Sequence, residues 1–241
     1  MEAFKPEWPA PKSIHAFVTT RKGGVSLAPY DSCNMGDHVG DQSDAVAQNR
    51  SLFRSQLPGN PYWLNQTHST IVREYEADCQ NAPEADASYT TKRNQPCVVI
   101  TADCLPVLFC NKQGTQVAAA HAGWRGLLEG VLENTIRIFS PQDELMAYLG
   151  PAIGPNHFEV GSEVKQAFQA VQPESERAFS VSHNSDKWMA DIYELARLRL
   201  NACGVKDIYG GDQCTFNDAE RYFSYRRDGV TGRMASVIWI E

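Results

Sequence analysis

Three short apolar runs follow one another in the middle of the chain, and they constrain the fold more than any other feature. They cover residues 96–101, 106–110 and 115–121, and a turn sequence at 111–114 separates the second run from the third. Short apolar runs bounded by turn residues are typical of central strands in a sheet. The turn at 111–114 has the length of a hairpin connection, so the region predicts neighbouring strands with no helix between them.

The rest of the chain predicts more strands than helices. Segments rich in β-forming residues predict strands at 14–20, 62–66, 70–76, 144–150, 222–225 and 235–240. Apolar residues at helical spacing predict helices at 44–57 (Ser43 as N-cap, Pro58 as the stop), 127–139, 162–172 and 189–203 (Gly204 at the C-cap). Many strands with hairpin-length connections favour a mixed-sheet α+β fold over a doubly wound parallel sheet. No linker, fixed-period repeat or low-complexity tract interrupts the sequence, so we expect one continuous domain over residues 1–241.

Charge and apolarity disfavour several classes of partner. Lys and Arg total 22 and Asp and Glu total 29, so the formal net charge is −7. An acidic balance argues against binding to nucleic acid or to an anionic membrane surface. No apolar run approaches the roughly 20 residues of a membrane span, and the N-terminal segment lacks the apolar region of a secretory signal. We therefore expect a cytoplasmic protein that acts on small molecules, as a monomer or a small homo-oligomer.

The number and spacing of the cysteines give no sign of a disulfide framework. The chain has seven cysteines, an odd number, and no two of them form a C-x-x-C pair. A disulfide framework is typical of shorter, denser sequences, so we expect reduced thiols that mostly fill the core. The seven are Cys33, Cys79, Cys97, Cys104, Cys110, Cys203 and Cys214.

Three apolar segments each place a metal-type side chain at a strand end. These side chains are His68 in NQTHST, Cys104 in TADCLP and His121 in AAAHAGWRG. Imidazole and thiolate are natural zinc ligands, and three of them without an obvious fourth resemble a catalytic site with one open position. The same residues also fit a thiolate nucleophile at Cys104 with a histidine as base, and their spacing does not separate the two chemistries. Asp103 stands beside Cys104 as a further candidate for catalysis.

Two basic clusters lie at opposite ends of the chain. Arg21 belongs to the first, and Arg226, Arg227 and Arg233 belong to the second. Arginine beside glycine and hydroxyl residues is typical of loops that bind phosphate or carboxylate, so these four are candidates for an anion site. A third polar loop, at 34–41, contains His38 without an assigned partner. The sequence contains no G-x-G-x-x-G after a strand and no Walker A motif, which gives no indication of a common nucleotide cofactor.

The motifs together resemble the YfiH family, also called the laccase-domain or multicopper polyphenol oxidase family and, alternatively, a purine nucleoside phosphorylase family. The resemblance runs in order along nearly the whole chain, and the combination of motifs is specific although each single motif is not. It rests on FVTTRKGGVSLAPYDSCNMGDHVGD (17–41), QTHS (66–69), TADCLPV (101–107), HAGWRG (121–126), GPAIGP (150–155) and FSYRRDGVTGRMAS (223–236).

The resemblance implies a four-layer α/β/β/α arrangement, similar to the catalytic domain of cytotoxic necrotizing factors. It also implies a mononuclear zinc site whose ligands map onto His68, Cys104 and His121. The reactions it implies are phosphorolysis of adenosine, inosine and 5′-methylthioadenosine, together with deamination of adenosine. Some bacterial members are linked instead to editing of peptidoglycan precursors, and the older name implies oxidation of phenols with copper.

The residues themselves weigh these alternatives. A multicopper oxidase needs more imidazole ligands than the six histidines of this chain, although two histidines and a cysteine could hold a single copper. Phosphorolysis fits better: the arginines could bind phosphate, aromatic residues could hold the purine, and Asp103, His38 or a water on the metal could supply the proton. Amide hydrolysis would use the same metal or the Cys104 thiolate. A zinc-stabilised binding module is disfavoured, because structural zinc sites normally close with four protein ligands.

Overall fold

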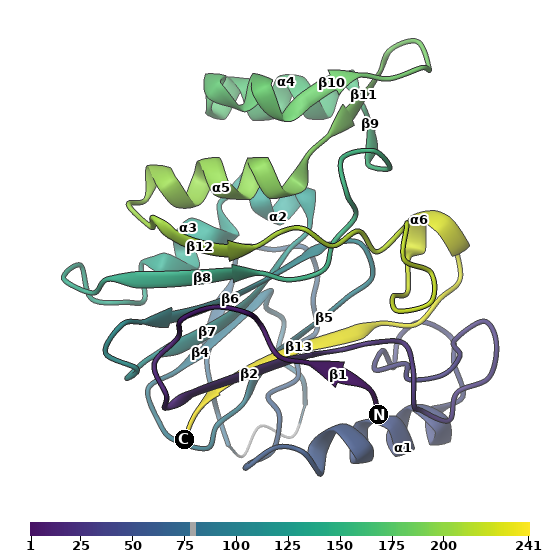
Figure 1. Cartoon of the computed structure of the whole chain (residues 1–241), viewed down its shortest axis with the longest axis vertical. Helices are drawn as coiled ribbons and strands as arrows, with labels where there is room; N and C mark the ends of the chain where they lie inside the picture. Colours follow the sequence, from purple (N-terminus) through teal and green to yellow (C-terminus); the bar gives the residue numbers. More distant parts are fainter. Residues whose placement is uncertain (78–80) are drawn as a thin grey trace.

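Two β-sheets stack face to face at the centre of the molecule, and helices cover both outer faces (Figure 1). The computed structural model describes residues 1–77 and 81–241. The larger sheet has the order β12 (Asp207–Gly210), β8 (Leu145–Leu149), β6 (Leu105–Asn111), β7 (Val117–Ala122), β4 (Ala87–Thr90) and β3 (Val72–Glu74). The smaller has the order β1 (Ala3–Phe4), β2 (Ile14–Thr19), β13 (Met234–Ile240) and β5 (Cys97–Thr101).

The helices complete the layers. Helix α1 (Ser43–Arg54) packs Phe53 against β2, β5 and β13 on the smaller sheet. On the larger sheet, α2 (Trp124–Glu129), α3 (Val131–Ile136) and α5 (Ile192–Ala202) pack against β6, β7 and β8. The layer order α/β/β/α agrees with the predicted fold class.

The central strands are apolar along most of their length because their side chains alternate between two faces that are both buried. In β6, Val107 and Phe109 face the helices, whereas Leu108 and Cys110 face the other sheet. Both faces are covered, so every residue of β6 and β7 is buried. β6 pairs antiparallel with both β7 and β8, whereas β12–β8 and β3–β4 are parallel pairs. The sheet is therefore mixed, as predicted.

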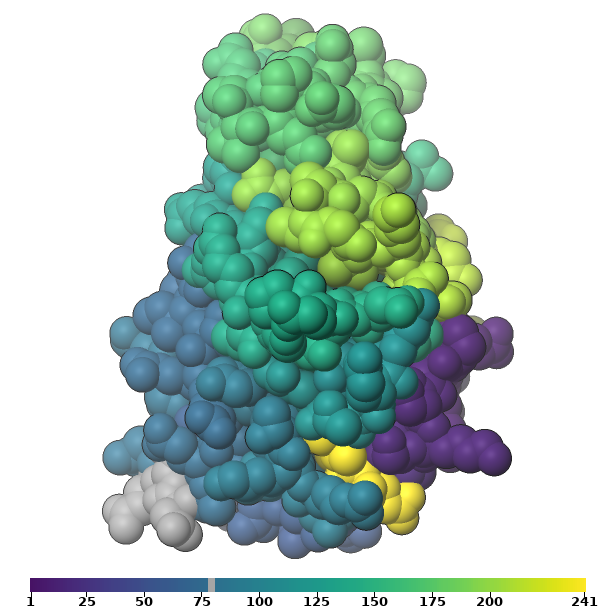
Figure 2. Space-filling view, turned by 90° about the vertical axis from the view of Figure 1, so that its left-hand side faces the viewer, coloured from purple at the N-terminus to yellow at the C-terminus, as the bar shows by residue number. Residues whose placement is uncertain are grey.

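A small additional layer lies beyond α5. It consists of β9 (Glu159–Gly161), α4 (Ser162–Val171), the 3₁₀ helix η1 (Pro173–Ala178), β10 (Phe179–Val181) and β11 (Lys187–Ala190). These residues form the narrow green end of the molecule in Figure 2. Its strands are too short for an alternation signal, and the sequence predicts only the helix at 162–172.

Local chemistry overturns two predicted strands and divides one predicted helix. Residues 62–66 make only isolated bridges, from Tyr62 to Cys97 and from Asn65 to Glu84. Residues 222–225 are not a strand, because the Ser224 hydroxyl caps α6 (Tyr225–Asp228) by accepting from the Arg227 amide. The predicted helix at 127–139 breaks at Gly130, whose φ of 102° lies in the left-handed region and separates α2 from α3.

Four helix boundaries also differ from the prediction. Gln42, not Ser43, is the N-cap of α1, and the helix ends at Arg54, before Pro58. Asp191 caps α5 by accepting from two backbone amides, so that 189–190 belong to β11 instead. The C-cap of α5 is Cys203, and Gly204 follows it with a φ of 85°. The other predicted strands and helices each contain an observed element of the predicted kind.

The described cysteines are free thiols, and Cys79 lies outside the described residues. Cys33, Cys97 and Cys110 are buried, and burial raises the pKa of each thiol. None of the helices in the described ranges combines the length and apolarity that a membrane span requires.

Candidate metal centre

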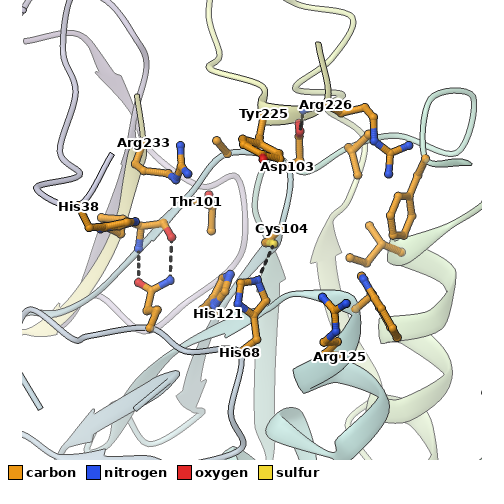
Figure 3. A pocket seen from close by; sticks show the side chains of 17 residues that line it. His38, His68, Thr101, Asp103, Cys104, His121, Arg125, Tyr225, Arg226 and Arg233 are labelled. Atoms are coloured by element: carbon orange, nitrogen blue, oxygen red, sulfur yellow. Dashed lines mark hydrogen bonds between the residues drawn. The ribbon is translucent and has the colours of Figure 1, made fainter. Parts of the chain in front are cut away.

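His68, Cys104 and His121 come together although they are far apart in the sequence. Their ligand atoms lie within 4.8 Å of one another, and Cys104 Sγ is 3.7 Å from His68 Nε2 (Figure 3). Antiparallel pairing brings Cys104 close to His121. The start of β6 lies beside the end of β7, with Leu105 opposite Ala122. His68 reaches the same point from the loop before β3, with a φ of 61°.

A buried carboxylate beneath the cluster holds both histidines, and the sequence reasoning missed it. Asp86 is fully buried directly before β4. Its Oδ1 accepts from His121 Nδ1 at 2.7 Å and from the His68 amide at 3.0 Å. Its Oδ2 accepts from the Thr67 amide at 3.2 Å and from the amide and hydroxyl of Ser69 at 2.5 and 2.7 Å. Its sequence signal is an aspartate between two alanines, Ala85 and Ala87.

The charges of these groups support one another. Burial alone would raise the pKa of Asp86, but the hydrogen bond and charge of His121 and the donors of Ser69 outweigh it, so the pKa is lowered. The carboxylate therefore accepts from His121 Nδ1–H, so Nε2 is the ring nitrogen that remains for a metal ion. Burial would likewise raise the pKa of Cys104, but the charge and hydrogen bonds of His121 and His68 lower it. A stabilised thiolate suits both a metal ligand and a nucleophile.

The donor set fits a single metal ion. One thiolate and two imidazoles are ligands for zinc, and they also suit a single copper. The backbone at Gly123 passes so close that a Cβ there would lie 2.5 Å from His68 Cδ2 and 3.1 Å from Cys104 Sγ. Glycine is required at this position for the two side chains to converge.

The cluster opens into a cavity of about 580 Å³, a size typical of small-molecule sites (Figure 3). Gln66 joins its wall to β5, because its side-chain amide exchanges two hydrogen bonds of 2.8 Å with the backbone of Ile100. The lining residues are His38, Gln66, His68, Ile100, Thr101, Ala102, Asp103, Cys104, His121, Trp124, Arg125, Ile153, Phe158, Ile192, Tyr225, Arg226 and Arg233.

Two of the four predicted anion-binding arginines line the cavity, and two do not. Arg226 and Arg233 are in its wall. Arg21 lies elsewhere, where it donates to the carbonyls of Asp31 and Ala219 and covers the ring of Phe223.

Arg227 is also outside the lining. It donates to the carbonyls of Thr215, Phe216 and Tyr222 and pairs with Asp228. Arg21 and Arg227 thus hold loops together. The structure adds Arg125, which the sequence reasoning noted only as part of a motif.

Asp103 lines the cavity, but its carboxylate is turned toward the backbone of neighbouring loops (Figure 3). One oxygen accepts from the Thr215 hydroxyl and the other from the Arg226 amide, each at 2.6 Å. The residue has a φ of 88°, in the left-handed region. Its contacts join the turn before β6 to Thr215 and to the backbone of α6.

His38 lies at the side of the cavity that also holds Arg233 (Figure 3). Its Nδ1 is 3.5 Å from Oδ1 of Asp37. The structure therefore brings the polar loop at 34–41 into the site, a placement that the sequence did not specify.

Comparison with known proteins bears directly on these features. Residues 15–241 match the family model described as multi-copper polyphenol oxidoreductase laccase. The chain is 54% identical over 245 residues to a purine nucleoside phosphorylase of Haemophilus influenzae, with all of both chains covered. The chain belongs to the YfiH family. Its relative in Escherichia coli, the purine nucleoside phosphorylase YfiH, is 54% identical over 98% of this chain and 97% of that protein.

Solved structures of the YfiH family agree with the fold. A Neisseria meningitidis protein of the DUF152 family has a TM-score of 0.97 at 50% identity, with both chains fully covered. YlmD from Geobacillus stearothermophilus has a TM-score of 0.90 at 30% identity over 100% of this chain and 97% of that one. The older family description names several coppers, whereas the described residues contain one cluster of two imidazoles and one thiolate. That cluster suggests a metal and does not identify it.

Proposed function

We propose that this chain is a metal-dependent purine nucleoside phosphorylase that also deaminates adenosine. Its substrates are adenosine, inosine and 5′-methylthioadenosine, which it splits with phosphate into free base and sugar phosphate. The observation that carries the proposal is the convergence of His68, Cys104 and His121 on the floor of a cavity walled by arginines and aromatic rings. The names of the relatives from Haemophilus influenzae and Escherichia coli support it.

His68, Cys104 and His121 would hold the ion, through Nε2 of both histidines and the Cys104 thiolate. Zinc is the ion we propose, with copper as the alternative that the same donors accept. A bound ion of this kind supplies Lewis-acid polarisation of a substrate oxygen or activation of water. Asp86 keeps the Nδ1 proton on His121 and so preserves the ligating tautomer.

The remaining wall residues bind and orient the nucleoside. Tyr225 offers aromatic surface for the purine. Both oxygens of Asp103 are engaged, so we assign the proton that the leaving purine takes up to His38, whose side chain lines the cavity. The apolar side chains of Ile153, Phe158 and Ile192 reduce the access of water to this part of the cavity.

The decisive measurement is base release from inosine with and without inorganic phosphate. We expect sugar phosphate only when phosphate is present, and loss of activity when a chelator removes the metal. Full phosphorolysis by rigorously metal-free protein would favour Cys104 as a covalent nucleophile instead. Oxidation of a phenol by copper-loaded protein, without any base release, would overturn the proposal in favour of the oxidase.

The role of His38 has its own test. His38→Gln should slow inosine phosphorolysis much more than that of 7-methylguanosine, whose base already carries the positive charge that protonation would supply. Equal slowing of both substrates would remove His38 from proton transfer.

A further inference from the structure

The lining of the cavity carries an excess of positive charge. Three arginines line the cavity, Arg125, Arg226 and Arg233, and Asp103 is the single carboxylate among the lining residues. Both oxygens of Asp103 already accept hydrogen bonds from Thr215 and from a backbone amide. The wall therefore favours an anionic ligand.

Arg125 and Arg226 lie on one side of the three candidate metal ligands, whereas Arg233 and His38 lie on the other (Figure 3). Each of the two has an aromatic ring beneath its guanidinium. Arg125 Cζ is 4.4 Å from the ring centre of Trp124, and Arg226 Cζ is 5.6 Å from that of Phe158. Stacking restrains a guanidinium while leaving the N–H groups at its edge available to an anion.

The hydrogen bonds of these side chains leave donors unused. Nη1 of Arg226 donates to the carbonyls of His157 and Glu159, at 3.3 and 2.9 Å, which fixes the side chain. Its Nε and Nη2 have no hydrogen-bond partner within the described ranges. The Arg125 guanidinium has neither a hydrogen bond nor an ion pair with any described residue. The Glu159 carboxylate also interacts with the charge of Arg226, and its Oε1 accepts hydrogen bonds from Ser182 and Asn184.

We propose that Arg125 and Arg226 together bind inorganic phosphate, and that Arg233 and His38 serve the nucleoside on the opposite side. Two guanidinium groups from different elements, α2 and α6, would grip the phosphate oxygens through charge-assisted hydrogen bonds. Only the use of the phosphate as a co-substrate rests on the proposed phosphorylase function. The anion site itself is inferred from the charge and the unused donors of the two arginines.

The bound phosphate has a defined part in the reaction. One of its oxygens forms a bond to the anomeric carbon while the bond from that carbon to the purine nitrogen breaks. The purine leaves with the electron pair and takes up one proton, and the hydrogen phosphate gives up one, so no further reactant is needed. The phosphate lies on one side of the three candidate metal ligands and the base on the other. This arrangement separates the nucleophile from the leaving group, as the displacement requires.

The test is titration of inorganic phosphate into the metal-loaded protein, followed by kinetics with varied phosphate. Arg125→Ala and Arg226→Ala should each weaken phosphate binding and raise the KM for phosphate by about 10- to 100-fold, while the KM for inosine changes by less than about threefold. Arg125→Lys should weaken phosphate binding less than Arg125→Ala. Lysine keeps the positive charge, although it lacks the paired N–H donors of the guanidinium. Arg73→Ala, an exposed arginine on β3 outside the cavity, is the matched control and should change nothing.

The outcomes separate this inference from the proposed function. Phosphate binding that depends on both arginines, in a protein that releases no base, would keep the anion site and overturn phosphorolysis. Phosphorolysis with an unchanged phosphate KM in both variants would overturn the anion site and keep the function. Loss of phosphate binding in Arg233→Ala, but not in the other two variants, would also overturn it. Failure of the unaltered protein to bind phosphate at all would do the same.

Discussion

The floor and the rim of the cavity are built by different means. The floor holds His121, Cys104 and His68, and the fully buried Asp86 ties both histidines down through hydrogen bonds. The rim holds exposed side chains such as Tyr225, which is 61% exposed. Groups that must meet one ion need fixed positions, whereas groups that recognise a substrate can complete their contacts when it arrives.

This difference predicts that changes in the floor remove the metal and the chemistry together, whereas changes in the rim alter substrate affinity. Buried, mutually hydrogen-bonded groups act as a unit, because losing one partner leaves the others unpaired. Exposed side chains lose only their own contact with the ligand. Four substitutions test the contrast.

The largest effect is expected for Cys104→Ala. Loss of the thiolate should lower metal content and base release together, by more than about 100-fold in activity, because even the loss of a group that merely supports a ligand costs 10- to 100-fold. Metal analysis after dialysis, paired with the inosine assay, measures both. Cys203→Ala, at an exposed thiol, is the control and should behave as the unaltered protein. Full metal retention in Cys104→Ala would show that the thiolate is not a ligand.

Gly123→Ala should come next, with turnover about 100-fold lower. The new Cβ would fall 2.5 Å from His68 Cδ2, so the imidazole must move away from the cluster. Gly204→Ala is a useful comparison: its Cβ meets nothing within 4 Å, and its φ of 85° should cost about 1 kcal/mol of stability without affecting turnover. If both variants lose only stability, the close approach at Gly123 does not position the site.

Asp86→Asn should weaken metal binding by about 10- to 100-fold. An amide presents one oxygen and one N–H₂ group, whereas His121, His68 and Ser69 all donate to the carboxylate, so at least one donor is left facing another donor. Chelator competition measures the affinity, and the ¹⁵N shifts of the His121 ring report its tautomer. Asp44→Asn, at an exposed position of α1, is the control. Ser69→Ala removes one bond and should have a smaller effect; unchanged affinity and an unchanged tautomer in Asp86→Asn would contradict the positioning role.

The smallest effect is expected at the rim, for Tyr225→Ala. Loss of the ring should raise the KM for inosine by about fivefold or more, with metal content and kcat unchanged, because stacking of an aromatic ring on a base contributes about 1–3 kcal/mol. Tyr225→Phe keeps the ring and should match the unaltered protein. A fall in metal content in Tyr225→Ala would erase the distinction between floor and rim.

The sequence predicted three central strands well and several other segments poorly. The apolar runs at 96–101, 106–110 and 115–121 became β5, β6 and β7, because strands buried on both faces must be apolar throughout. The strand predicted at 222–225 failed because a serine cap started a helix there, and the helix at 127–139 broke at one glycine. Local hydrogen bonds and a single positive φ decide such points, and apolar periodicity does not report them.

Residue type and local pattern by themselves determined the central strands and the choice of three metal-type side chains. Residue chemistry suffices for this, because few side chains other than His and Cys make good zinc ligands. The tertiary structure alone decided that His68, Cys104 and His121 meet, that Asp86 holds two of them, and that Arg125 enters the cavity while Arg21 and Arg227 bind loops. These facts depend on strand register and on which loops pack together, and contacts between residues far apart in the chain leave no mark in the pattern around either residue.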